Sequence, residues 1–427
     1  MNHEPDIDST RPSLCDRPHA TRAALRAATA SLLLIASACS SSGSSTASDP
    51  ATSTSTPVTA PAPSTTTPSS EPATTTAPST TAAAAQNDAL QSLITGILET
   101  HYAADDFVGA RIALLDADGT VTAAEVGTST DDPAGAPVDP DVAWNIGSVT
   151  KTFVAVVVLQ LAEEGRIDLD AGIEPYLPDL ADADRITPRD LLQHTSGLGE
   201  YKNDPAVLAD AQREWTPSEL IAVAEKAGRQ GEPGGPHRYS NTNYIVLGEI
   251  IEAVTGHSWS DEVRTRIVEP LGMTNTSLIT TEQPVGYQLV NGAFIDTTLM
   301  TNPSIGGAAG ALQSTGHDLL IFAKALLDGT LLTRASSAAM TTFVPGDDYS
   351  DFGIRHSYGL GIEEYANDTI TIIGHMGTGD AQSAFLGYDP QHDTAVAVMT
   401  NTATPGPQAI MALETLVGAG QTELPRV

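Results

Sequence analysis

The chain has 427 residues and carries 53 acidic against 20 basic residues, which gives a formal net charge of −33. So large an excess of negative charge argues against a nucleic-acid partner and against direct docking on an anionic lipid surface. Two cysteines, one of them in a segment that export would remove, exclude a disulfide framework.

The first 39 residues are typical of a bacterial export signal. Basic residues between Arg11 and Arg26 precede an apolar run that ends at Ile35 and is too short to span a membrane. Small residues directly before Cys39 resemble a lipobox, which predicts a lipid on Cys39 and a lipoprotein on the outer face of the cell membrane. Ala36 stands where a lipobox usually has leucine. Ordinary cleavage, which would give a secreted protein, is therefore the alternative.

A linker follows the signal. All but four of the residues from 40 to 85 are Ser, Thr, Pro or Ala, a composition that cannot bury enough apolar surface to offset the ordering of its backbone. We therefore predict a disordered linker over residues 40–86.

The remaining chain alternates between strand and helix patterns. Residues 87–102 predict an amphipathic helix, and 108–127 predict a hairpin turning at Asp118-Gly119. Residues 369–373, 383–388 and 394–399 predict three more strands, and 408–418 a closing helix. The expected fold is α/β of the α+β type. It has a five-stranded antiparallel sheet flanked by helices and a mainly helical subdomain over about 148–330.

Ser148 and Lys151 are the first candidates for chemistry. Residues three apart on a helix share a face, so the amine of Lys151 can reach the hydroxyl of Ser148. A serine needs a neighbour that takes its proton, and burial can lower the pKa of a lysine far enough for this task. The following run to Leu161 is almost wholly apolar and ends near Gly165, which favours a central buried helix over a buried strand.

Several motifs together resemble one family. The stretches 146–151, 191–198, 239–244 and 374–378 resemble the serine β-lactamase and DD-peptidase superfamily, in the branch of class C β-lactamases, D-alanyl-D-alanine carboxypeptidases and esterases. Their order and spacing agree with that branch. The resemblance covers roughly residues 88 to 420, so one β-lactamase-like serine hydrolase domain is expected over 87–420.

The resemblance implies a role for each site residue. Ser148 would be the nucleophile, and Lys151 and Tyr239 would move its proton, with Tyr239 titrating toward the phenolate as base or co-base. Asn241 would aim its amide at the substrate and at Lys151, with helix capping as the alternative role. His194 is expected to be structural.

The third motif is expected to bind substrate. The N–H groups of Ser148 and Thr378 would form an oxyanion hole, His375 would supply positive or donor character, and Gly377 would allow a close backbone approach. Met376 departs from the family, which has Thr or Ser at this place to help hold a substrate carboxylate. This departure weakens the lactamase and carboxypeptidase interpretations relative to an esterase.

The sequence thus predicts an exported serine hydrolase that forms an acyl-enzyme on Ser148. A D-alanyl peptide, a β-lactam and a simple ester all stay open as substrates. The alternative from another class is a non-catalytic module that binds penicillin or a peptidoglycan fragment on the same fold. We expect a monomer that takes a small-molecule or cell-wall peptide substrate, touches the membrane only through its lipid, and needs no cofactor or metal.

Overall fold

The structure, a computed structural model, describes residues 80–132, 134–280, 283–349, 353–404 and 406–422. The predicted export signal, the predicted lipidation site Cys39 and most of the predicted linker lie outside these residues, so all three stay predictions. Within the described residues, no helix combines the length and apolar character that crossing a membrane requires.

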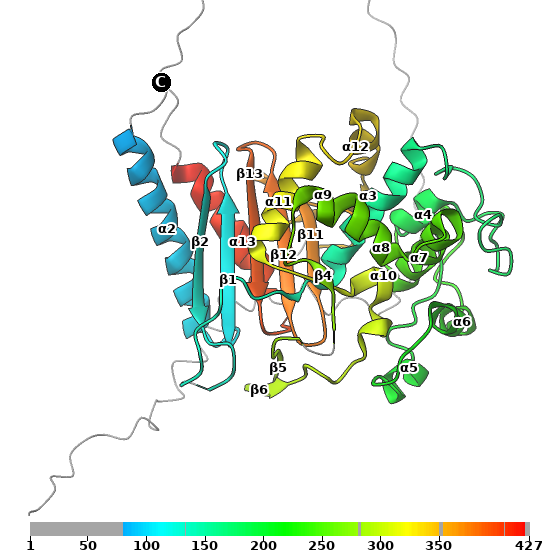
Figure 1. Cartoon of the computed structure of the whole chain (residues 1–427), viewed down its shortest axis with the longest axis horizontal. Coiled ribbons are helices and arrows are strands. Elements are labelled where there is room, and N and C mark those ends of the chain that lie inside the picture. Colours follow the sequence, from blue (N-terminus) through cyan, green and yellow to red (C-terminus); the bar gives the residue numbers. More distant parts are fainter. Residues whose placement is uncertain (1–79, 133, 281–282, 350–352, 405, 423–427) are drawn as a thin grey trace, which may run out of the picture.

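The centre of the fold is an eight-stranded antiparallel sheet in the order β2-β1-β13-β12-β11-β10-β9-β8 (Figure 1). The five predicted strands are present as β1 (Gly109–Leu115), β2 (Val121–Gly127), β11 (Thr371–Thr378), β12 (Ser383–Asp389) and β13 (Thr394–Thr400). The prediction of five strands was wrong by three, because β8 (Val344–Pro345), β9 (Arg355–Tyr358) and β10 (Glu363–Ala366) extend the sheet beyond β11. β8 has only two residues, and β9 and β10 are short and mostly polar, so none of the three has the apolar alternation that marks a strand.

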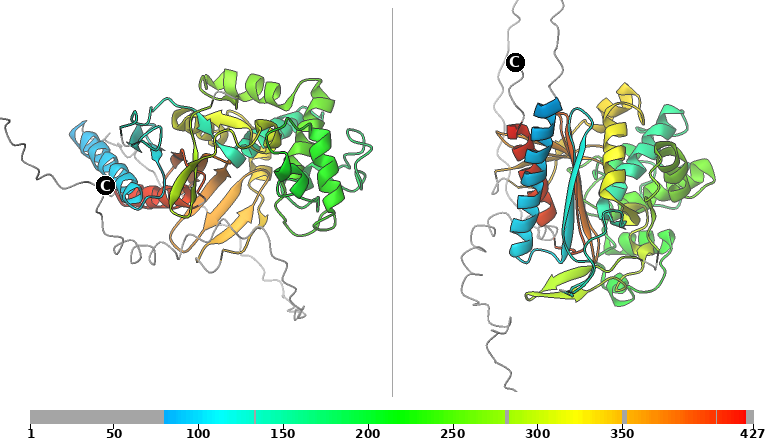
Figure 2. Two further views of the ribbon diagram at one scale, coloured as in Figure 1. Left: turned by 90° about the horizontal axis from the view of Figure 1, so that it is seen from below. Right: turned by 60° about the vertical axis from the view of Figure 1, so that its left-hand side comes forward.

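The first and last helices cover one face of the sheet, as predicted. α2 (Thr80–Ala103) and α13 (Pro407–Thr422) pack on each other and on β2 and β13 (Figure 2). α2 begins seven residues before the predicted start at 87, inside the predicted linker. The alanine run 82–85 explains the difference, since alanine has the highest helix propensity of the residues.

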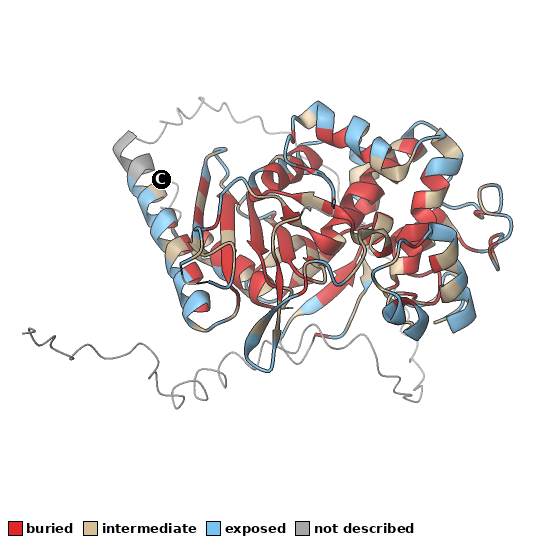
Figure 3. Ribbon diagram, turned by 60° about the horizontal axis from the view of Figure 1, so that its bottom comes forward, coloured by how far each residue is buried: buried red, intermediate tan, exposed pale blue. Residues whose placement is uncertain are grey.

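The helix that follows Ser148 lies on the opposite side of the sheet with the remaining helices. A 3₁₀ turn, η1 (Gly147–Val149), leads into α3 (Thr150–Glu163), and α11 (Gly316–Leu327) packs against β1, β12 and β13. The chain leaves the helix at Gly165, whose φ of 69° suits a glycine after a helix end. α3 is buried along nearly its whole length, which confirms a central buried helix (Figure 3).

The helical region beside the sheet is made of short elements. Its helices are α4 (Pro188–Leu192), α5 (Pro205–Ala209), α6 (Pro217–Ala227), α7 (Asn241–Thr255), α8 (Trp259–Val263), the π-helical η2 (Arg264–Val268), α9 (Glu269–Leu271), η3 (Pro303–Ile305), α10 (Gly307–Gly310) and α12 (Arg334–Met340). Two small sheets join it to the main sheet: β3 (Trp144–Asn145) with β7 (Leu312–Ser314) and β4 (Ser277–Leu278), and the hairpin of β5 (Tyr287–Val290) and β6 (Ala293–Asp296). Proline at the first turn and a capping box start both α4 and α6.

Candidate active site

Ser148 lies where the end of β11 meets the start of the central helix. Gly147, with φ of 51°, is so close to Thr378 that a Cβ on it would lie 2.7 Å from the Thr378 nitrogen. A Cβ on Gly377 would lie 1.9 Å from the carbonyl oxygen of Ile146. Both positions need glycine, because only the absence of a side chain lets the strand approach the serine this closely.

The structure brings Ser148, Lys151, Tyr239 and Asn241 together. Lys151 Nζ lies 2.9 Å from Ser148 Oγ and 2.9 Å from Asn241 Oδ1, and it donates to the carbonyl of Ala309 at 2.8 Å. The hydroxyl of Tyr239 donates to Ser148 Oγ at 2.9 Å. These side chains come from the helix start at η1 and α3 and from the start of α7, which places the group between two packed helices.

The hydrogen bonds define a proton path through the serine. Asn241 Oδ1 and the Ala309 carbonyl can only accept, so they take two protons of Lys151 Nζ. A neutral amine then has one lone pair left, which faces Ser148 Oγ. Since Tyr239 donates to the same oxygen, the serine hydroxyl is free to donate its own proton to Lys151.

Burial sets the protonation states that this path requires. It lowers the pKa of Lys151 to about 7, against the opposing effect of the nearby Glu200 carboxylate. Burial also raises the pKa of Tyr239 well above its usual value, although its hydrogen bond to Ser148 acts the other way. Burial of Tyr239 therefore disfavours the predicted phenolate: near neutral pH the lysine can be the base and the tyrosine a protonated donor.

His194 packs with its ring against the ring of Tyr239. Its ring lies 4.2 Å from the Tyr239 ring, centroid to centroid, and is fully buried. Its Nδ1 accepts from the Ser240 N–H at 3.2 Å and from the Asn243 amide at 2.9 Å. Burial lowers the pKa of His194 well below its usual value, so it stays neutral and structural, as the sequence predicts.

The predicted oxyanion donors lie on neighbouring segments. Thr378 faces Ser383 on β12, and the next residue, Gly379, donates its N–H to Gln382 at 2.8 Å. Hydrogen-bonded and non-hydrogen-bonded pairs alternate in antiparallel strands, so the N–H of Thr378 points away from β12. The N–H of Ser148 belongs to the first turn of η1, where helical N–H groups have no partner within the helix. Both residues line the same cleft.

His375 does not have its predicted place in the cleft. Its side chain is buried, with Nε2 2.8 Å from the Tyr358 hydroxyl and Nδ1 2.6 Å from the Met376 carbonyl. A carbonyl only accepts, so Nδ1 carries the proton and Nε2 accepts from Tyr358. Burial lowers the pKa of His375 despite the neighbouring Glu363 carboxylate. The predicted positive charge is therefore absent near neutral pH.

Met376 also lies elsewhere than the sequence suggested. Successive residues of a strand point to opposite faces, and Met376 packs on the α13 side, in an apolar hollow with Tyr365, Phe385 and Leu413. The family hydroxyl that it replaces would lie on that far face in this structure. Met376 thus gives no support for or against carboxylate recognition.

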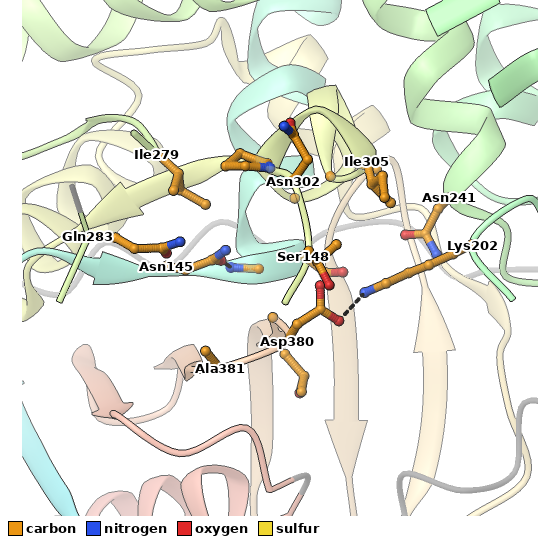
Figure 4. Close-up of a pocket in the computed structure, with 18 of the residues that line it drawn as sticks. Asn145, Ser148, Lys202, Asn241, Ile279, Gln283, Asn302, Ile305, Asp380 and Ala381 are labelled. Atoms are coloured by element: carbon orange, nitrogen blue, oxygen red, sulfur yellow. Dashed lines mark hydrogen bonds and ion pairs between the residues drawn. The ribbon is translucent and has the colours of Figure 1, made fainter. Parts of the chain in front are cut away.

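The cleft above Ser148 encloses about 650 Å³, part of it open to solvent, which is within the usual range for small-molecule sites (Figure 4). Its lining includes two charged residues that the sequence analysis missed, Lys202 and Asp380. A third missed residue, Glu200, accepts from the backbone and side-chain N–H groups of Asn241 at 2.7 and 3.1 Å. Its position shortly after the 191–198 motif was the available signal for Glu200.

Comparisons with known proteins show what the chain is similar to. The family model described as Beta-lactamase matches residues 94–419. Penicillin-binding protein 4 of Amycolatopsis lactamdurans is 28% identical over 62% of this chain and 74% of its own length. Teichoic acid D-alanine hydrolase of Staphylococcus aureus is 30% identical, but the match covers only 37% of this chain and 38% of that protein.

Solved structures match over a larger share of the chain. A D-amino acid amidase from Ochrobactrum anthropi SV3 superposes with a TM-score of 0.71 at 27% identity, over 77% of this chain and 98% of that one. A D-stereospecific amidohydrolase from a Streptomyces species has a TM-score of 0.66 at 31% identity, over 76% and 97%.

Proposed function

Since the chain belongs to the Beta-lactamase family, we propose that it is a serine hydrolase that forms an acyl-enzyme on Ser148 and acts on D-aminoacyl esters or amides. The observation that carries the proposal is the pair of 2.9 Å contacts that Ser148 Oγ makes with Lys151 and Tyr239. The substrate class rests on the similar proteins, two of which are named for acting on D-amino acid amides and on the D-alanine of teichoic acid.

In the acylation step, Lys151 takes the proton of Ser148 while Oγ attacks the substrate carbonyl. The oxyanion that forms accepts from the N–H groups of Ser148 and Thr378, each worth about 3 kcal/mol in comparable reactions. Tyr239 gives its proton to the departing alcohol or amine and regains one from the neighbouring Lys151 ammonium, which contacts the same Ser148 oxygen. The bond to the leaving group breaks, and the acyl group stays on the serine.

Deacylation uses the same groups in the reverse direction. A water molecule takes the place of the leaving group and loses its proton toward Tyr239 and Lys151 as it attacks the ester carbonyl. Collapse of the second oxyanion releases the D-amino acid, and the proton returns to Ser148 Oγ. Every proton that the cycle moves is thus restored, and no cofactor enters it.

Turnover of D-alanine p-nitrophenyl ester tests the proposal. Ser148→Ala is expected to lower kcat/KM by at least about 1,000-fold, because the nucleophile acts as a unit with its base. Ser277→Ala, at an exposed serine of β4, is the matched control and should behave as the parent.

The same assay separates catalysis from binding alone. The penicillin-binding relative favours a second candidate, a module that holds a wall fragment or penicillin without turnover. If the parent binds a fluorescent penicillin but hydrolyses neither it nor the D-alanyl ester, the binding module is the correct description and the hydrolase proposal fails.

A further inference from the structure

Two charged side chains face each other across the cleft. Lys202 comes from the segment between α4 and α5, and Asp380 comes from the turn between β11 and β12. Lys202 Nζ lies 3.7 Å from Asp380 Oδ1, beside Ser148 (Figure 4). Among the described residues that line the cleft, these two are the charged ones. A substrate that reaches Ser148 therefore meets this pair.

The pair is loose, and its two members differ in side-chain length. The Lys202 side chain is 36% exposed and the Asp380 side chain 38%, and ion pairs so open to water contribute little to stability. The backbone carbonyl of Asp380 is fixed by Gln288 at 2.9 Å and Thr297 at 2.7 Å, from the β5–β6 hairpin and its end. Lys202 instead carries its charge on a four-carbon stem. Lys202 can therefore swing away while Asp380 stays in place.

Of the two carboxylates Glu200 and Asp380, Asp380 is the one whose oxygens can accept hydrogen bonds from a ligand. Glu200 accepts three hydrogen bonds, two from Asn241 and one from the Lys202 N–H at 2.7 Å, so its oxygens are occupied. In the part of the chain that the structure describes, the Asp380 carboxylate makes one contact, the long ion pair with Lys202. Its carboxylate can accept more.

The charges behind the cleft favour a cationic group. Glu363 is buried beside His375 and accepts from the Tyr365 hydroxyl at 2.7 Å and the Met376 N–H at 2.9 Å. Burial alone would raise its pKa, but the neighbouring His375 and His356 and the hydrogen bond from Tyr365 bring the pKa of Glu363 to about 2. A buried carboxylate behind the cleft repels a substrate carboxylate and attracts an ammonium group.

We propose that Asp380 is a specificity-determining residue that binds the free α-ammonium group of the substrate, and that the ammonium displaces Lys202. The inference rests on the proposed function and names its substrate class: aminoacyl esters or amides whose amine is unblocked. Asp380 follows Thr378 by two residues, and an α-ammonium nitrogen is two bonds from the carbonyl carbon. Thr378 and Asp380 line the same cleft as Ser148, so a substrate whose carbonyl oxygen binds the Thr378 N–H brings its α-ammonium group into the cleft that holds the Asp380 carboxylate.

Binding to a variant without the nucleophile tests the subsite separately from catalysis. In the Ser148→Ala background, we expect D-alaninamide to bind about tenfold more tightly than N-acetyl-D-alaninamide, measured by calorimetry at low salt. Adding Asp380→Asn should abolish this ratio. Adding Lys202→Met should increase it about two- to threefold, because a competing cation is removed. Asp179→Asn, at an exposed carboxylate outside the cleft, is the control and should leave the ratio unchanged.

The binding results test the ammonium subsite separately from the proposed hydrolase function. Equal affinity for the two amides, or a ratio that survives Asp380→Asn, would overturn the subsite even if the parent hydrolyses both kinds of ester. A ratio that Asp380→Asn abolishes establishes the subsite even if the parent hydrolyses no ester, and in that case the proposed function is what fails.

Discussion

Lys151 is a fully buried amine whose three hydrogen-bond contacts include no carboxylate. Removing an ammonium from water without such a partner is costly, so burial lowers its pKa to about 7. The spacing of Ser148 and Lys151 could predict that they meet. It could not predict the Ala309 carbonyl, which comes from a segment more than 150 residues away and directs the lysine lone pair at the serine.

The lowered pKa of Lys151 predicts how the rate of hydrolysis depends on pH. Protonated Lys151 cannot accept the serine proton, so kcat/KM for a D-alanyl ester should rise about tenfold per pH unit below about 7 and level off above it. The substrate ammonium and ester hydrolysis in water must be followed in parallel as controls. A profile that stays flat from pH 5.5 to 8.5 would mean that Lys151 is not the base.

Neighbouring residues of β11 contribute either to the candidate site or to the packing of the sheet. Gly377 lies against the segment that carries Ser148, and His375 is buried beside Tyr358. Met376, between them in the chain, packs among apolar residues beneath α13. The motif 374–378 could be located from the sequence, together with the hairpin of β1 and β2. The direction of each side chain could not, because the register depends on β10, a short strand that carries no apolar alternation.

The family motif suggests that residue 376 affects the choice of substrate, but the position of the Met376 side chain predicts that it does not. Met376→Thr should leave the ratio of ester to β-lactam hydrolysis unchanged within about twofold, since its side chain lies on the far face of the sheet. It should lower the free energy of unfolding by about 1–3 kcal/mol, because a hydroxyl would enter an apolar hollow. Met376→Leu is the control and should cost less. A tenfold shift of the ratio toward β-lactams with normal stability would place this residue in the cleft.

At the scale of the whole molecule, the cleft exists because two layers meet at Ser148: the sheet contributes Thr378 and Asp380, and the helical region contributes Lys202 and Asn241. The sequence could predict both layers from hydrophobic patterns. It could not predict the charged pair across the cleft, since Lys202 and Asp380 lie far apart in the chain and neither belongs to a recognised motif.

We propose that the folded domain is exported and held at the membrane by a lipid on Cys39. Cys39→Ala should then move the protein from the membrane fraction to the medium, while the specific activity of the released domain stays that of the parent. Cys15→Ala is the matched control, because Cys15 lies in the segment that export would remove. Identical partitioning of parent and Cys39→Ala would indicate ordinary signal cleavage.

The identity of the nucleophile is the central claim, and trapping it covalently tests this most directly. The parent is treated with a fluorophosphonate and, separately, with D-alanine p-nitrophenyl ester under acid quench, and intact mass and peptide mapping locate the adduct. We expect one adduct, on Ser148, and none on Ser148→Ala, whose thermal transition should move little because only a hydroxyl is lost. An adduct on another residue, or equal labelling of Ser148→Ala, would contradict the mechanism.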